Sequence, residues 1–161
     1  MRQLKLFSTS LYYFDTSAFI DLTYHYPKDI FPTIWSKLEN MIQNQELFSH
    51  IEVLNEINNG ERDEVHNWCN KHKKIFKDID GDQLKNLEKI KSKYPENIWA
   101  RESSKPHWAD PWLVSLAICD ECTIIVTNEV DKNFRIPFVA RLFNIACLGL
   151  HDFFRNIRIL Y

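Results

Sequence analysis

Two short apolar runs, far apart in the chain, most constrain the fold. The first, Leu11 to Phe14, leads directly into Asp15 and a brief helical pattern. The second, Thr123 to Val126, is β-branched and typical of a parallel strand buried on both faces. Because such a strand needs helices on both sides, the alternation of short strands with helical patterns predicts a three-layer α/β/α domain.

Helix-start signals occur between and after these runs. Ser49 and Glu52 have the spacing of a capping box, which predicts that a helix opens at Ser49. Asp110 before Pro111 predicts another helix, with the aspartate as N-cap. Apolar spacing and turn residues predict helices over 30–43, 63–75, 82–93, 137–144 and 151–157 and strands over 47–48 and 145–148.

The composition is typical of one globular domain spanning residues 1–161. With 45% apolar and 14% aromatic residues, the chain can build a substantial core. The polar, lysine-rich segment 61–104 is expected to be a helical insert within that domain. A net charge of −2 excludes a broadly basic nucleic-acid-coating surface, and three glycines exclude glycine-loop nucleotide sites.

The four cysteines are too few and too scattered for a disulfide scaffold. Cys119 and Cys122 have the spacing of a zinc pair but lack a second pair of that kind, so a zinc site is not expected. Residues 1–10 are too polar for a signal peptide, and no apolar stretch approaches the roughly 20 residues of a membrane span. These features predict a soluble cytoplasmic protein that has no membrane partner.

Four acidic residues lie where a parallel sheet places its ligand sites. Asp15 and Glu129 follow the two apolar runs, Asp110 opens a helix, and Glu56 lies one turn beyond Glu52. Carboxylates gathered in one cleft repel one another unless a cation offsets their charge. Mg²⁺ or Mn²⁺ prefers such oxygen ligands, so the pattern predicts a divalent metal centre.

Four segments resemble the ordered motifs of PIN domains: Tyr13 to Ala18, Ser49 to Glu56, Ala109 to Ala117, and Ile125 to Glu129. The nearest resemblance is to a bacterial PIN-like subfamily with a threonine-x-glutamate variant of the last motif. The resemblance implies a Rossmann-like, mostly parallel sheet and a metal-dependent endoribonuclease that hydrolyses RNA with a metal-activated water. It also implies a VapC-like toxin, paired with an antitoxin protein in a type II toxin–antitoxin system.

The resemblance assigns roles to particular residues. Asp15, Glu56 and Asp110 match the metal-binding acids, and Thr127 matches the threonine that orders the site. Glu129 stands where many PIN domains have aspartate, and Asp131 is an alternative fourth acid. PIN proteins commonly dimerise through helices, so a homodimer is also expected.

Basic residues near these motifs are candidates for substrate contact. Arg101, Lys105 and Arg135 could bind phosphate, and Ser17 could hold water or phosphate or act only as a cap. Lysines of the middle helices could bind the phosphates of an RNA backbone, although lysine-rich helix faces are usually only solvent-exposed surface.

Three readings therefore remain open from the sequence. The favoured one is an endoribonuclease; the alternatives are a DNA or flap-type nuclease and a non-catalytic PIN-like module that binds RNA or protein. Each acid alone has an ordinary explanation as a cap or a solvated side chain. Their common order along the chain is what favours a shared site.

Overall fold

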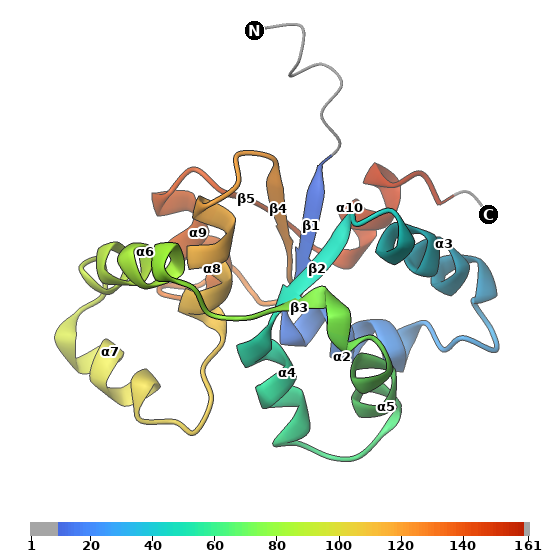
Figure 1. Ribbon diagram of the computed structural model, residues 1–161, viewed down its shortest axis with the longest axis horizontal. Coiled ribbons are helices and arrows are strands. Elements are labelled where there is room, and N and C mark those ends of the chain that lie inside the picture. The colour runs from blue at the N-terminus through green and yellow to red at the C-terminus, as the bar shows by residue number, and fades with distance from the viewer. Residues whose placement is uncertain (1–9, 160–161) are drawn as a thin grey trace, which may run out of the picture.

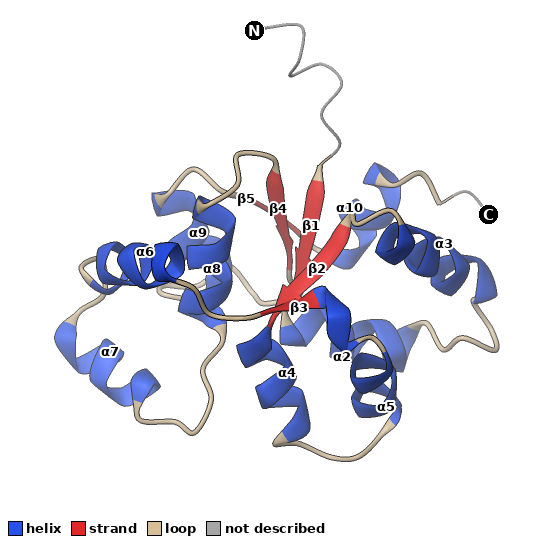
Figure 2. Cartoon of the chain, in the orientation of Figure 1, coloured by secondary structure: helices blue, strands red, loops and turns tan. Residues whose placement is uncertain are grey.

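Five short strands form one parallel sheet at the centre of the protein (Figures 1 and 2). The computed structural model of the chain describes residues 10–159, so most of the segment considered as a signal peptide lies outside the described residues. The strands lie in the order β3-β2-β1-β4-β5. Their bounds are β1 Leu11–Phe14, β2 Leu47–His50, β3 Phe76–Lys77, β4 Thr123–Val126 and β5 Ala146–Leu148.

Helices cover both faces of this sheet and confirm the predicted three-layer α/β/α, Rossmann-like class. Their bounds are α2 Thr16–His25, α3 Pro32–Gln43, α4 Ile51–Asn58, α5 Glu64–Lys71, η1 Lys73–Ile75, α6 Gly81–Lys91, α7 Glu96–Ser103, α8 Asp110–Ile118, α9 Ile136–Leu142 and α10 Leu150–Asn156. Helices α6, α8 and α9 lie on one side of the strands, and α3 and α10 lie on the other (Figure 1). In the part of the chain that the structure describes, no helix is long and apolar enough to cross a membrane.

The core sits between the sheet and these helices, as the apolar patterns predict. Tyr13 and Phe14 of β1 are almost fully buried, and Phe14 packs edge-on against Phe153 of α10. Helix α3 buries a stripe at helical spacing, which confirms the predicted amphipathic helix in this region. The stripe consists of Ile34, Trp35, Leu38, Met41 and Ile42.

The capping box predicted at Ser49 is wrong, because β2 continues through Ser49 and His50 before α4 begins at Ile51. His50 is the N-cap, and its Nδ1 accepts a hydrogen bond from the Glu52 backbone at 3.0 Å. Ser49 Oγ instead donates to the Phe14 carbonyl at 2.6 Å. This hydrogen bond joins β2 to β1 beside the position of Asp15.

Replacing Ser49 by alanine should lower the free energy of unfolding by about 1 kcal/mol, because the Phe14 carbonyl loses a buried donor. Urea denaturation followed by circular dichroism would measure this change. Ser36→Ala, on the exposed face of α3, is the matched control and should stay within about 0.5 kcal/mol of the parent. Equal losses in the two variants would contradict the structural role given to the Ser49 hydroxyl.

The N-cap assigned to Asp110 is also wrong. Ala109 occupies the N-cap position of α8, and Asp110 is the first helical residue. Within the described residues, no side-chain hydrogen bond caps this end of the helix. The Asp110 carboxyl is therefore not engaged as a helix cap.

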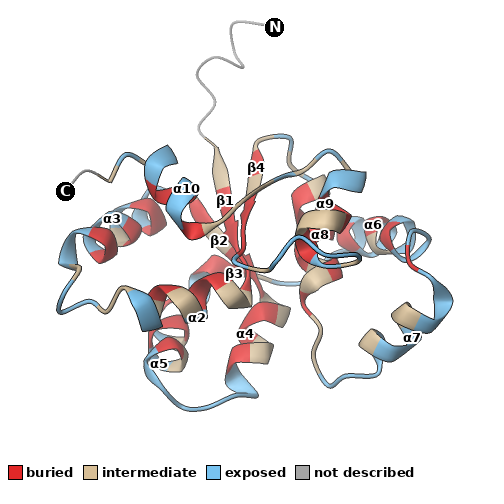
Figure 3. Ribbon diagram, turned by 180° about the vertical axis from the view of Figure 1, so that it is seen from behind, coloured by how far each residue is buried: buried red, intermediate tan, exposed pale blue. Residues whose placement is uncertain are grey.

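The segment 61–104 contains more than helices. It contributes β3, which pairs with β2 through Ser49 opposite Phe76 and forms one edge of the sheet. It also contains α7, which no sequence pattern predicts and which, as described by the structure, has no buried residue. Figure 3 shows α7 standing out from the buried core, with exposed and intermediate residues along its length.

Candidate functional site

The sheet order brings two acidic motifs together. Strands β1 and β4 pair directly, with Phe14 opposite Val126, although they are distant in sequence. The chain order of the strands reverses at this pair, and ligands of open α/β sheets bind at such a switch point, beyond the carboxyl ends of the strands. Asp15 and Thr127 are the first residues beyond those ends.

Asp15 is the most firmly held acid of the site. Its side chain is only 2% exposed, and its Oδ2 accepts hydrogen bonds from Ser17 Oγ at 2.8 Å and Thr127 Oγ1 at 2.9 Å. Burial raises the pKa of Asp15, and these hydrogen bonds lower it in part. A buried carboxylate fixed by two hydroxyls is suited to a rigid ligand position.

Glu56 reaches the same place from α4. Thr16 Oγ1 donates to its Oε1 at 2.8 Å, so the residues after β1 hold both acids. Burial raises the pKa of Glu56 to about 7; the Thr16 hydrogen bond opposes this shift, and the charge of Asp15 adds to it. Glu56 is thus not on a freely solvated helix face.

Asp110 and Glu129 complete the cluster. The pKa of Asp110 is raised well above its usual value by burial, and further by the charges of Asp15, Glu129 and Glu56. Asp110 keeps an intermediate surface exposure, which indicates that it borders an opening. Burial and the charge of Asp15 also raise the pKa of Glu129. Because such coupling weakens with distance, the four carboxyls occupy one site.

Backbone and cationic groups orient Glu129. Its Oε2 accepts a hydrogen bond from the Ile136 backbone at 3.2 Å, and Arg135 lies 3.6 Å from its Oε1. The Glu129 backbone donates to Thr127 Oγ1 at 3.1 Å. Thr127 therefore links the acids after β1 and β4 through one buried hydroxyl.

The four acids fit a hard divalent cation by their chemistry, since every donor is a carboxylate oxygen. Within residues 10–159, however, no three His, Cys, Asp or Glu side chains are already arranged as a ligand set. Hydrogen bonds to hydroxyl or backbone donors instead occupy the carboxyls of Asp15, Glu56 and Glu129. Binding a cation would therefore require side-chain rotation, for which the long Glu56 and Glu129 side chains are suited.

The remaining candidate residues divide into two groups. Arg101 and Arg135 line a small cavity of about 70 Å³ together with Asp110, so they border the acid cluster. Lys105 pairs with Glu102 on the exposed side of this region. Asp131 is exposed and pairs with Arg141, so the fourth acid brought to the cluster is Glu129.

Sequence reasoning missed three residues close to the site. Thr16 holds Glu56, and its position directly after Asp15 was the available signal. Glu102 binds Arg101 and lines the cavity beside Asp110. Burial raises the pKa of Tyr94, and the negative charges of Asp110, Glu129 and Glu102 raise it further. No sequence spacing signals this position, because it depends on how the 61–104 segment folds back toward α8.

For a metal centre at these four acids, replacing Thr127 by valine should weaken Mn²⁺ binding by about 10–100-fold, as loss of a group that orients a metal ligand usually does. Valine keeps the shape but removes the hydrogen bonds to Asp15 and from the Glu129 backbone. Calorimetric titration would measure the affinity. Thr127→Ser retains the hydroxyl and should bind within a few-fold of the parent. Parental affinity in Thr127→Val would contradict the orienting role.

The fold and the site define an α/β protein whose sheet gathers four carboxyl side chains at its switch point. Residues 12–161 match the family described as Domain of unknown function (DUF4411). The chain belongs to this family. No curated protein matches the chain.

Proposed function

We propose that the protein is a PIN-domain endoribonuclease that hydrolyses RNA phosphodiester bonds with Mg²⁺ or Mn²⁺. The observation that carries this proposal is the convergence of four acids at the carboxyl end of the sheet: Thr127 Oγ1 binds both the Asp15 carboxyl and the Glu129 backbone, Thr16 beside Asp15 binds Glu56, and Asp110 and Arg135 line one cavity. Buried acids with raised pKa values are costly to keep ionised, and they gather in proteins chiefly where function needs them.

Different residues would bind the metal ions and the phosphates of the substrate. Asp15, Glu56, Asp110 and Glu129 would hold the ions, with Asp15 fixed by Ser17 and Thr127. Bound Mg²⁺ or Mn²⁺ would supply the charge that activates an attacking water and offsets charge on the phosphate. Arg101 and Arg135 border the cavity at Asp110, where guanidinium groups could bind the phosphates of an incoming strand.

Incubation of the purified protein with labelled single-stranded RNA and DNA of matched sequence tests this proposal. We expect internal cleavage of RNA that requires Mn²⁺ or Mg²⁺ and stops with a chelator. Cleavage of DNA alone would assign the site to a DNA or flap-type nuclease instead. Absence of both cleavage and saturable Mn²⁺ binding would favour a non-catalytic binding module.

The PIN resemblance extends the proposal to a VapC-like toxin that acts in the cytoplasm, pairs with an antitoxin protein and forms a homodimer. Induced expression in bacteria should then arrest growth, and Asp15→Asn should relieve the arrest. Growth arrest of equal depth at equal protein level in the Asp15→Asn strain would separate toxicity from the metal site.

A further inference from the structure

An aromatic cluster lies beside the acid cluster. The ring of Tyr94 contacts Trp99, Trp108 and Phe134, with centroids 5.3, 5.5 and 5.3 Å away. Trp99 and Trp108 are 5.1 Å apart in an edge-to-face arrangement, and both remain partly exposed. The cluster thus forms a continuous wall between α7 and the loop that precedes α8.

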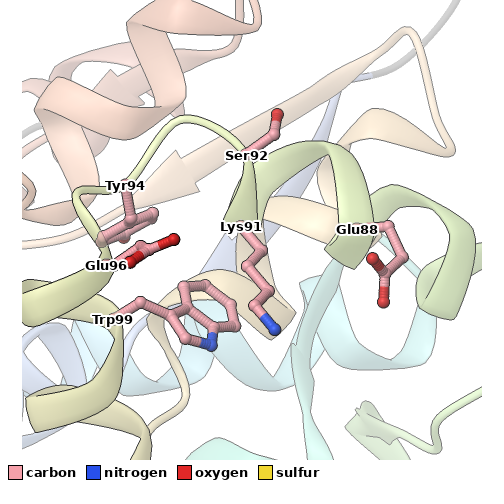
Figure 4. A pocket seen from close by; sticks show the side chains of 6 residues that line it. All are labelled: Glu88, Lys91, Ser92, Tyr94, Glu96 and Trp99. Carbon is pink, nitrogen blue, oxygen red and sulfur yellow. The ribbon is translucent and has the colours of Figure 1, made fainter.

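A cavity of about 570 Å³ opens on the outer side of this wall. Its size falls within the roughly 300–1,000 Å³ typical of sites for small organic groups. Figure 4 shows the indole of Trp99 facing the side chain of Lys91, whose Nζ is 5.9 Å from the ring centroid. The lining residues are Glu88, Lys91, Ser92, Tyr94, Glu96 and Trp99.

The aromatic wall connects this cavity with the proposed catalytic site. Trp108 and Phe134 line the small cavity that contains Asp110 and Arg135. Tyr94, which lines the larger cavity, is 7% exposed, and its hydroxyl has no hydrogen-bond partner among residues 10–159. A buried hydroxyl without a partner is uncommon and calls for an explanation such as an absent water or ligand.

The backbone at Phe134 also indicates a constrained position. Its φ of 60° places a bulky residue in the left-handed region, a conformation that costs energy and clusters at functional sites. The ring is held between Tyr94 and Phe138, at centroid distances of 5.3 and 5.0 Å. Packing therefore maintains the strained turn that puts this ring beside Asp110.

We propose that the cavity between α6 and α7 is a subsite for one unpaired nucleobase, stacked on Trp99, of a strand whose backbone passes the acid cluster. This inference rests on the proposed nuclease function. Bases stack on tryptophan whatever their identity, because every base has a π-face. The subsite would select unpaired strands, since a base inside a duplex cannot reach an aromatic wall.

The charges around the cavity suit a base better than a phosphate. Glu88 and Glu96 line it and would repel a phosphate, while their oxygens can accept hydrogen bonds from amino groups of a base. Lys91 also lines this cavity, over the Trp99 ring, so its ammonium can donate to a base oxygen. Arg101 and Arg135 lie apart from it, beside Asp110, where a backbone would pass. Acids at the cavity and arginines beside Asp110 match a nucleotide, in which base and phosphate point apart.

Fluorescence anisotropy with a labelled single-stranded RNA of about twelve nucleotides tests the subsite. Binding is measured with the full chain in chelator, so that no cleavage occurs. Trp99→Leu should weaken binding on the order of tenfold, whereas Trp99→Phe should keep it within about threefold. Tyr24→Leu removes an 80%-exposed aromatic ring from α2 and is the matched control, expected to bind like the parent.

An abasic scan of the RNA tests the same contact without altering the protein. One abasic position should weaken binding to the parent by a similar factor and should have little further effect in Trp99→Leu, because both changes remove one interaction. Loss of affinity that is uniform along the scan would overturn the proposal. Equal losses in Trp99→Leu and Trp99→Phe, or a Trp99→Leu loss that is the same for duplex RNA, would also overturn it.

A Mn²⁺ titration of the same preparations separates the two proposals. A parent chain that binds no Mn²⁺ would contradict the nuclease function. The affinity for single-stranded RNA in chelator tests the subsite independently of the metal. A parent chain that binds Mn²⁺ and cleaves RNA, but whose affinity for RNA is unchanged in Trp99→Leu, would remove the subsite and leave the nuclease.

Discussion

For the proposed nuclease, Asp110→Asn should reduce metal-dependent RNA cleavage by about 100-fold, because loss of a metal ligand should cost no less than loss of the groups that orient ligands. Asparagine has nearly the same shape, so packing at the start of α8 should persist. Steady-state cleavage assays at saturating Mn²⁺ would measure the change in kcat/KM.

The same substitution should stabilise the metal-free protein. Asp110 is repelled by Asp15, Glu129 and Glu56, and removing its charge relieves that repulsion. The melting temperature in chelator should therefore rise while activity falls, an outcome that a merely misfolded variant would not produce. Asp131→Asn, which breaks an exposed pair with Arg141, is the control and should retain parental cleavage. Parental cleavage in Asp110→Asn would refute the site.

Without a divalent cation, the free energy of unfolding should fall as the pH rises from about 5 to 8. The pKa of Glu56 is about 7 in the folded protein against an ordinary 4.5, so the folded state holds a proton that the unfolded state releases. The resulting stabilisation is complete below pH 4.5 and is lost as the pH rises through 7. Burial raises the pKa values of Asp15, Asp110 and Glu129 in the same direction.

For one such proton, the free energy of unfolding falls by up to about 1.4 kcal/mol per pH unit. Mn²⁺ should offset this fall, and the more so toward pH 8, because it binds the ionised carboxylates. Urea denaturation in chelator and in Mn²⁺ at several pH values would measure both effects. Glu56→Gln should reduce the slope in chelator by the share of one proton, whereas the exposed Glu61→Gln should leave it as in the parent. A metal-free protein that becomes more stable from pH 5 to 8 would contradict the buried acid cluster.

The layers of the fold could be predicted because strands β1 and β4 are short apolar runs in the sequence. Leu11–Phe14 and Thr123–Val126 are both strands with the predicted bounds, and they pair with each other. The acids after them could therefore be expected at one edge of the sheet. The structure brings Asp15, Glu56, Asp110 and Glu129 to that edge, while their metal-binding role remains a prediction.

Other elements could not be predicted, for physical reasons. Strand β3 has only two residues, Phe76–Lys77, and its pairing with β2 depends on tertiary contacts rather than on a local pattern. Helix α7 buries no residue in the described structure, so it has no apolar stripe to detect. Ser49 reads as a helix cap, but its hydroxyl is used in the sheet because the Phe14 carbonyl lies beside it.

The aromatic cluster beside the acids illustrates the same limit. Trp99, Trp108 and Phe134 show no common periodicity, and they meet only because the chain returns from α7 to α8 and then from β4 to α9. A cluster built from one helix and two separate loops carries no spacing signal in the sequence. Its recognition requires the folded chain.

The pairing of β1 with β4 also bears on synthesis of the protein. A growing chain that has not yet supplied Thr123–Val126 contains Asp15, Glu56 and the β2 edge of the sheet, but it lacks the strand that pairs with the other edge of β1. Pairing between such distant segments forms slowly, because a long loop must close before any contact repays it. In an unfinished chain on the ribosome the acid cluster is therefore incomplete, and the proposed activity would begin only after Thr123–Val126 and Glu129 have been translated.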